Sequence, residues 1–151
     1  MKEIKLLVMD VDGTLTDGKI YMSADGEIMK AFNIKDGYGI VRLKEKGIIP
    51  VIITGRSSEI VANRCKELGI EELHQGIEDK KSKLLEVCDK YHFEVSNVAY
   101  IGDDLNDLEC MKICGITAAP ADAMEEILNT VNYVCRHKGG DGAVREFIEK
   151  L

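Results

Sequence analysis

Asp10 and Asp12 are the first residues of this chain whose type and spacing suggest chemistry, and they directly follow the apolar run 6–9. In an extended chain, side chains two positions apart point to the same side, so these two carboxylates should share one face. Two carboxylates at close range repel each other unless a cation or a shared proton relieves them. Mg²⁺ is the simplest relief, because this hard ion prefers oxygen ligands. The pair therefore predicts a magnesium site.

Polar groups also follow later apolar runs. Thr54, Gly55 and Arg56 come directly after residues 48–53, and the acidic segment 102–107 follows another such run. Short continuous apolar runs are typical of strands buried on both faces, as in a parallel sheet. Ligand sites in such sheets lie beyond the carboxyl ends of the strands. We therefore expect the three polar turns to gather at one edge of a sheet.

Two cations, Lys80 and Arg64, stand at positions in their expected helices that do not favour a positive charge, although a solvent-exposed side chain remains an interpretation of each. Lys80 begins a helix that Asp79 is expected to cap, and a positive charge there opposes the helix dipole. Arg64 lies four residues after Ile60 and four before Leu68, within the apolar stripe of the helix that follows Arg56. A charge in that stripe must be paired, extend its head group to solvent or lie at an interface.

The order of apolar segments predicts the fold. Strand-like runs alternate with helical periodicities, which is typical of βαβ units and a mostly parallel sheet. We expect one domain over residues 1–151 with a three-layer, Rossmann-like α/β architecture. The expected details are a turn at 33–37, a helix from about 38 to 46, a helix opened by Pro120 and Asp122 with Met124, Ile127 and Leu128 inward, a flexible basic loop at 136–142 and a last helix carrying Val144, Phe147 and Ile148.

Residues 19–32 interrupt this alternation. Two strand-like runs flank the Asp25-Gly26 turn, which predicts a β-hairpin projecting beside the Asp10 turn. A lone two-stranded hairpin is marginally stable in water. We therefore expect its apolar side chains to be covered from elsewhere, as by another subunit.

Composition excludes several classes of function. The net charge is −7 without any run of Lys and Arg, so nucleic acid and anionic membranes are not expected partners. No stretch has the length of a membrane span, and the apolar run at the N-terminus is too short for a signal peptide. The five cysteines form no zinc-type pair. Together, these features of the composition favour a protein of the reducing cytoplasm.

The nonamer DVDGTLTDG, which begins at Asp10, resembles the first motif of the haloacid dehalogenase superfamily, in the form of its cap-less branch. The resemblance implies that Asp10 is a nucleophile and Asp12 a general acid and base in phosphate-ester hydrolysis. It also implies Mg²⁺ held by the carboxylates of Asp10 and Asp103 and by the backbone carbonyl of Asp12.

Later segments match the other motifs of the superfamily in order. Thr54 resembles the second motif, whose hydroxyl holds the phosphoryl group, and Lys80 resembles the third, whose cation pairs with phosphoryl oxygens and the nucleophile. The segment GDDLND resembles the fourth: Asp103 matches the metal ligand, while Asp104 and Asp107 match supporting acids. Helix capping by Asp104 and Asp107 remains an alternative that is compatible with this role.

Over nearly the whole chain the resemblance extends to the phosphatases of 3-deoxy-manno-octulosonate 8-phosphate (KDO 8-phosphate), which are homotetramers without a cap domain. It implies that a neighbouring subunit closes each site. The residues that it assigns to substrate binding are Asp36, Gly37, Gly55, Arg56, Arg64 and Lys80.

The sequence is also compatible with other functions. Similar enzymes hydrolyse nine-carbon sugar-acid 9-phosphates, and sequence does not show the contacts that separate one more hydroxylated carbon. A phosphoryl-accepting receiver domain also combines an acidic Mg²⁺ site with Thr and Lys, but its phosphorylated Asp follows a middle strand. A catalytically silent tetrameric scaffold is the third interpretation.

Overall fold

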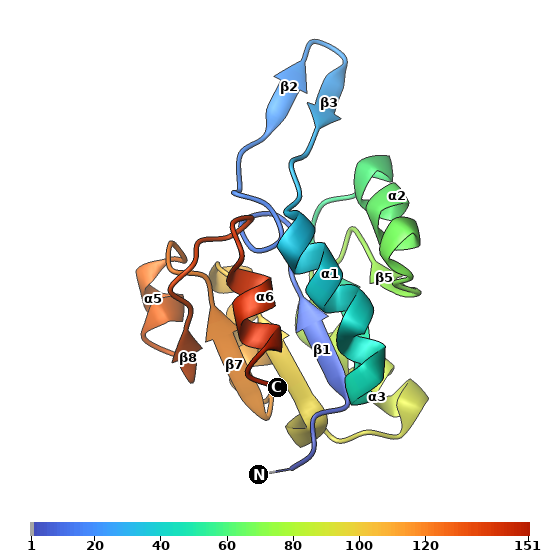
Figure 1. The fold of residues 1–151 in the computed structure, drawn as a ribbon, viewed down its shortest axis with the longest axis vertical. Coiled ribbons are helices and arrows are strands. Elements are labelled where there is room, and N and C mark those ends of the chain that lie inside the picture. Colours follow the sequence, from blue (N-terminus) through green and yellow to red (C-terminus); the bar gives the residue numbers. More distant parts are fainter. Residues whose placement is uncertain (1) are drawn as a thin grey trace.

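A computed structural model describes residues 2–151 of the chain. Its centre is a six-stranded sheet in the order β5-β4-β1-β6-β7-β8, in which every neighbouring pair is parallel (Figure 1). The predicted α/β, Rossmann-like sheet is therefore confirmed. The strands of this sheet are β1 (Leu6–Met9), β4 (Ile49–Ile53), β5 (Glu72–His74), β6 (Val98–Ile101), β7 (Ile116–Ala119) and β8 (Tyr133–Val134).

Helices cover both faces of the sheet and make the three layers. Side chains alternate along β1, so Leu7 and Met9 join the core on one face while Leu6 and Val8 join the core on the other. The first face is covered by α1 (Ile34–Arg42), α2 (Glu59–Leu68) and α6 (Ala143–Ile148), and the second by α3 (Lys80–Tyr91), α4 (Leu108–Met111) and α5 (Glu125–Leu128). Three 3₁₀ turns, η1 (Leu43–Lys46), η2 (Val95–Asn97) and η3 (Leu105–Asp107), complete the described helical structure.

Strand register brings the polar turns to one edge. Met9 at the end of β1 pairs with Ile52 of β4 on one side and with Ile101 of β6 on the other. The segments that begin at Asp10, Thr54 and Gly102 therefore leave the sheet side by side, as the sequence predicted.

The first helix begins earlier than expected. Residues 33–37 are not a separate turn: Asn33 caps α1, its side chain accepting hydrogen bonds from the backbone N–H groups of Lys35 and Asp36. Glycine favours turns, but a Cβ on Gly37 would lie 2.4 Å from an Arg64 nitrogen, so this glycine serves close packing of α1 against α2. At its far end the chain passes through η1 to Gly47, whose φ of 69° ends the helical segment as expected.

Two expectations near the C-terminus need correction. The helix expected at Pro120 begins at Glu125, and Met124 precedes it with 54 % of its surface exposed rather than pointing inward. The loop 136–142 does not extend freely into solvent, because Gly139 and Gly140 pack against the turn after β1. The Gly140 N–H donates to the Thr14 carbonyl at 3.0 Å.

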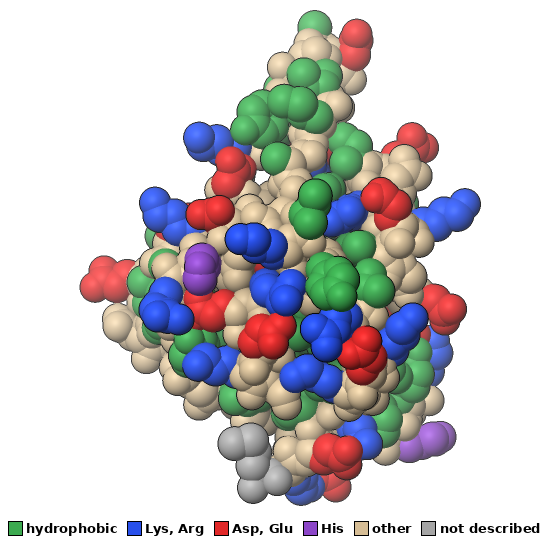
Figure 2. All heavy atoms as spheres, viewed as in Figure 1, with side chains coloured by type: hydrophobic (Ala, Val, Ile, Leu, Met, Phe, Trp, Pro, Cys, Tyr) green, Lys and Arg blue, Asp and Glu red, His purple; other side chains and the backbone are tan. Residues whose placement is uncertain are grey.

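The predicted hairpin is present and projects beyond the sheet (Figure 1). It consists of β2 (Tyr21–Ser23) and β3 (Gly26–Met29), which pair antiparallel. Four large apolar side chains of the hairpin segment are about half exposed: Ile20, Met22, Ile28 and Met29. Figure 2 shows hydrophobic side chains gathered on the surface of the hairpin. Among residues 2–151, no helix combines the length and apolarity needed to cross a membrane.

Candidate active site

The turn after β1 buries Asp10 against a cation. The Asp10 side chain is 8 % exposed, and its Oδ1 lies 3.1 Å from the Lys80 Nζ, which is itself fully buried at the start of α3. Lys80 also donates to Asp107 Oδ1 at 2.8 Å. Burial alone would lower the pKa of Lys80, but the carboxylates of Asp10 and Asp107 outweigh burial and raise it. Lys80 is therefore a fixed positive charge beneath the carboxylates.

Asp107 organises the acidic turn rather than facing the pocket. Its Oδ1 accepts hydrogen bonds from Lys80 and from the Tyr100 hydroxyl at 2.6 Å, and its Oδ2 accepts from the backbone N–H of Asp103 at 3.1 Å. Both oxygens are engaged, and the side chain is fully buried. Tyr100, a core residue of β6, was not predicted for the site because its position in an apolar run marks it only as a strand residue.

Three carboxylates approach within metal-binding range. One oxygen each of Asp10, Asp103 and Asp107 lies within 4.8 Å of the other two. Burial, followed by the repulsion between these acids, raises the pKa of Asp10 and of Asp103. An oxygen-only set of this kind fits a hard divalent cation, which would relieve the repulsion. Since Asp107 is already saturated with hydrogen bonds, Asp10 and Asp103 are the side chains free to coordinate.

Gly13 allows the first and fourth motifs to meet. Its φ is 88°, in the left-handed region, and a Cβ there would lie 1.9 Å from Asp103 Oδ2. The Thr14 hydroxyl donates to Asp103 Oδ1 at 3.3 Å. The turn after β1 and the turn after β6 are therefore in direct contact, and only glycine fits at position 13.

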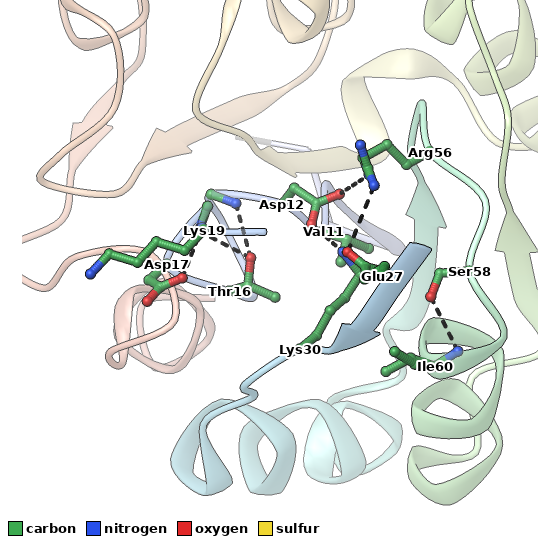
Figure 3. A network of polar contacts seen from close by, with 12 residues as sticks. Val11, Asp12, Thr16, Asp17, Lys19, Glu27, Lys30, Arg56, Ser58 and Ile60 are labelled. Atoms are coloured by element: carbon green, nitrogen blue, oxygen red, sulfur yellow. Dashed lines mark hydrogen bonds and ion pairs between the residues drawn. The ribbon is translucent and has the colours of Figure 1, made fainter. Parts of the chain in front are cut away.

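Asp12 points to a different group of residues from Asp10 (Figure 3). Its Oδ1 accepts a hydrogen bond from Lys30 Nζ at 2.6 Å, and Lys30 also donates to Glu27 at 2.9 Å. Arg56 lies 4.0 Å from Asp12 Oδ2 and 3.7 Å from Glu27. Lys30 and Glu27 were not predicted for the site.

The polar edge of the sheet encloses a pocket of about 380 Å³. The pocket brings together most of the site residues that were predicted from the sequence. It also includes Asn106, a residue of the fourth motif to which the sequence assigned no role. Lys80 and Asp107 do not line this pocket: Lys80 pairs with Asp10 at 3.1 Å, and one oxygen of Asp107 lies within 4.8 Å of one of Asp10. The lining residues are Asp10, Asp12, Thr54, Gly55, Arg56, Asp103, Asp104 and Asn106.

Asp36, Gly37 and Arg64 lie together but outside this pocket, along a narrow apolar crevice between α1 and α2. Arg64 pairs with Glu67 at 3.2 Å and lies over the Phe32 ring. Its buried Nε nevertheless has no hydrogen-bond partner among the described residues. The buried Asp36 accepts from the Arg145 backbone N–H at 2.9 Å and ties α1 to α6. Within one chain, these three residues do not reach the pocket.

A family model for haloacid dehalogenase-like hydrolases matches residues 70–148. The chain is also 45 % identical over 150 residues to KdsC, the KDO 8-phosphate phosphatase of Escherichia coli K12, covering 99 % of this chain and 80 % of that protein. The chain belongs to the haloacid dehalogenase-like hydrolases. KdsC of Yersinia pestis is another relative of this family, 47 % identical over 148 residues, or 98 % of this chain and 79 % of that protein.

Solved structures of haloacid dehalogenase-like hydrolases share the whole fold. The KDO 8-phosphate phosphatase of Moraxella catarrhalis, crystallised with magnesium, phosphate and KDO, superposes with a TM-score of 0.94 at 45 % identity. The superposition covers 97 % of this chain and 84 % of that one. Membership in the family rests on this agreement over nearly the full length of the chain.

Proposed function

We propose that this hydrolase is a Mg²⁺-dependent phosphatase that hydrolyses KDO 8-phosphate. The observation that carries the reaction is the buried Lys80 between Asp10 and Asp107, with Asp103 beside them, at the carboxyl end of the central strand. The observation that favours this substrate is the 45 % identity to KdsC over nearly the whole chain.

Asp10 acts as the nucleophile in the proposed reaction. A carboxylate oxygen of Asp10 attacks the phosphorus, and the bond from phosphorus to the sugar oxygen breaks as the Asp12 carboxyl gives its proton to that oxygen. Water then attacks the phosphorus of the aspartyl-phosphate and passes a proton to Asp12, which releases inorganic phosphate and regenerates Asp10. Asp12 thus serves both steps, because its proton returns at the end of the cycle.

The remaining residues hold charge and position. The Lys80 cation fixes the Asp10 carboxylate and offers charge to the phosphoryl oxygens, while Thr54 and Gly55 line the pocket where these oxygens would lie. Asp10 and Asp103 would hold Mg²⁺, with the Asp12 carbonyl as a further ligand. When bound, the metal neutralises the repulsion between the anionic nucleophile and the anionic ester.

Assembly and location belong to the same proposal. The half-exposed apolar side chains of the hairpin favour a homotetramer in which hairpins cover one another. In such an assembly Arg64 or Asp36 of one chain would act only through a neighbour, since neither lines its own pocket. We place the enzyme in the cytoplasm, where thiols stay reduced, because all five cysteines are free.

The substrate is tested by phosphate release with Mg²⁺ from KDO 8-phosphate, nine-carbon sugar-acid 9-phosphates, hexose phosphates and p-nitrophenyl phosphate. We expect the highest kcat/KM for KDO 8-phosphate. A higher kcat/KM for a nine-carbon acid would keep the mechanism and change the substrate. A long-lived phosphoaspartate without release of phosphate would instead support a receiver-like function.

A further inference from the structure

Lys30 is unusual because its side chain is buried although it directly follows a strand of an exposed hairpin. It follows β3, where the preceding residues Ile28 and Met29 are about half exposed, yet its own side chain is only 1 % exposed. A lysine is rarely buried unless its charge is paired. Lys30 Nζ binds two carboxylates, Asp12 at 2.6 Å and Glu27 at 2.9 Å. The chain directly after the hairpin therefore brings a buried cation into contact with Asp12, the residue that we assign as general acid and base.

The network around Lys30 is balanced in charge. Two carboxylates, Asp12 and Glu27, face two cations, Lys30 and Arg56 (Figure 3). Glu27 contacts both cations, so one residue of β3 fixes Lys30 on one side and approaches Arg56 at 3.7 Å on the other. Hydrogen bonding to Lys30 lowers the pKa of Glu27 and keeps it charged. The hairpin thus holds two pocket residues through one partly buried ion pair, Lys30–Glu27.

The two oxygens of Asp12 have different surroundings. Oδ1 accepts the hydrogen bond from Lys30, whereas Oδ2 accepts none from the described residues and lies on the side of Arg56, 4.0 Å away. Asp12 and Arg56 line the pocket, but Lys30 and Glu27 do not. With Oδ1 held, the carboxyl of Asp12 has one oxygen available to a substrate.

We propose that Lys30, anchored by Glu27, is a positioning residue that fixes the Asp12 carboxyl so that Oδ2 exchanges the proton with the leaving oxygen and with water. Holding a reacting group in one orientation before the reaction removes an entropic part of the barrier. The inference rests on the proposed phosphatase function. It assigns to the hairpin a catalytic contribution made within its own chain, separate from any contact with a neighbour.

Lys30→Met tests the proposal through its dependence on the leaving group. A sugar alkoxide needs a proton as it leaves, whereas p-nitrophenolate leaves well without one. Since general acid catalysis contributes about 10²- to 10⁴-fold, we expect kcat/KM for KDO 8-phosphate to fall roughly 10- to 100-fold and that for p-nitrophenyl phosphate less than about threefold. An equal loss on both esters would overturn the proposal, because a general structural defect affects both.

Lys19→Met is the matched control. Lys19 lies in the other leg of the hairpin, is exposed, and points away from Asp12 in Figure 3. The same change of charge and shape there is expected to leave both kcat/KM values unchanged. If Lys30→Met fails to fold, Glu27→Gln is the second variant: it keeps Lys30 but removes the charge of its anchor, and we expect the same dependence on the leaving group with a smaller loss.

A double variant tests whether Lys30 acts through Asp12. In an Asp12→Asn background the carboxyl no longer serves as acid, so adding Lys30→Met should cause no further loss of kcat/KM on KDO 8-phosphate. A further tenfold loss would mean that Lys30 acts elsewhere, and would contradict the proposal.

Failure of the proposed function is distinguishable from failure of this inference. If the wild-type enzyme prefers another alkyl phosphate, the same comparison is made with that ester. If it hydrolyses no ester, the phosphatase proposal fails, and crystal structures of the wild type and Lys30→Met decide the inference. A changed orientation of the Asp12 carboxyl in the variant would support it, and an unchanged one would overturn it.

Discussion

At the scale of single residues, the site is a balance of buried charges. Asp10, Asp103 and Asp107 repel one another, and Lys80 is the buried cation that pairs directly with two of them. Removing one partner of a buried ion pair leaves the other charge uncompensated, which costs more than the pair itself contributes. Lys80 is therefore expected to matter for folding as well as for the reaction.

Lys80→Met is predicted to lower the free energy of unfolding by about 3–5 kcal/mol in urea denaturation without metal, because Asp10 and Asp107 lose their cation. Mg²⁺ is expected to restore part of the loss by supplying positive charge to Asp10. Lys81→Met, at the neighbouring exposed lysine, is the control and should be near neutral. If the two variants were equally stable, Lys80 would not be a structural counterion.

At the scale of elements, Glu146 in α6 holds the loop that packs on the turn after β1. Its carboxylate accepts hydrogen bonds from the Tyr133 hydroxyl, from the backbone N–H groups of Arg136 and His137 and from the His137 ring. Burial alone would raise the pKa of Glu146, but these hydrogen bonds outweigh burial and lower it to about 2. The charged form therefore stabilises the folded loop.

Glu146→Gln is predicted to lower the free energy of unfolding at pH 7 by about 1–3 kcal/mol, since a buried charged acceptor is lost. Because the folded pKa lies below the ordinary value, this stabilisation is complete above about pH 4.5 and is lost as the pH falls toward about 2. The difference between wild type and variant should shrink over that range in urea titrations. Glu149→Gln is the control, because it removes the exposed partner of the Arg145 ion pair. Its free energy of unfolding should differ little from that of the wild type at any pH.

The strand ends could be predicted from the sequence because apolar runs mark buried parallel strands, and parallel strands end at one edge. This placed Asp10, Thr54 and Asp103 correctly relative to the sheet. Asn33 was not predicted as a helix cap, although its type favours that role, because Gly37 suggested a turn over 33–37. In the structure, glycine is needed at position 37 because the Arg64 side chain approaches too closely for a Cβ.

Contacts between distant segments could not be predicted in the same way. The packing of Gly139 on Gly13 joins opposite ends of the chain, and the Asp12–Lys30 pair depends on where the hairpin leg returns. No local pattern reports either distance. Arg64 illustrates the reverse case: its odd position in an apolar stripe was visible, but its partners Phe32 and Glu67 were not.

At the scale of the whole molecule, the projecting hairpin is the feature whose apolar side chains a single chain leaves exposed. The hairpin extends beyond the sheet (Figure 1), and large apolar side chains of its segment are about half exposed in the single chain. Burial of such surface against other copies is favourable in proportion to the area removed from water. The proposed tetramer therefore depends on the hairpin.

Met22→Lys is predicted to shift the sedimentation coefficient from that of a tetramer toward smaller species, because a charge replaces an apolar side chain that is 60 % exposed in one chain. Leu85→Lys is the control, since Leu85 is similarly exposed at 45 % but lies on α3, apart from the hairpin. A wild-type chain that sediments as a fully active monomer would contradict the proposed assembly.

The proposed mechanism is tested most directly by comparing phosphate release from KDO 8-phosphate by the wild type and by Asp10→Asn in the presence of Mg²⁺. We predict turnover by the wild type that stops when the metal is chelated. We predict no turnover by a folded Asp10→Asn variant, because the amide cannot form the aspartyl-phosphate. Release by that variant at a rate near that of the wild type would contradict the assignment of Asp10 as the nucleophile.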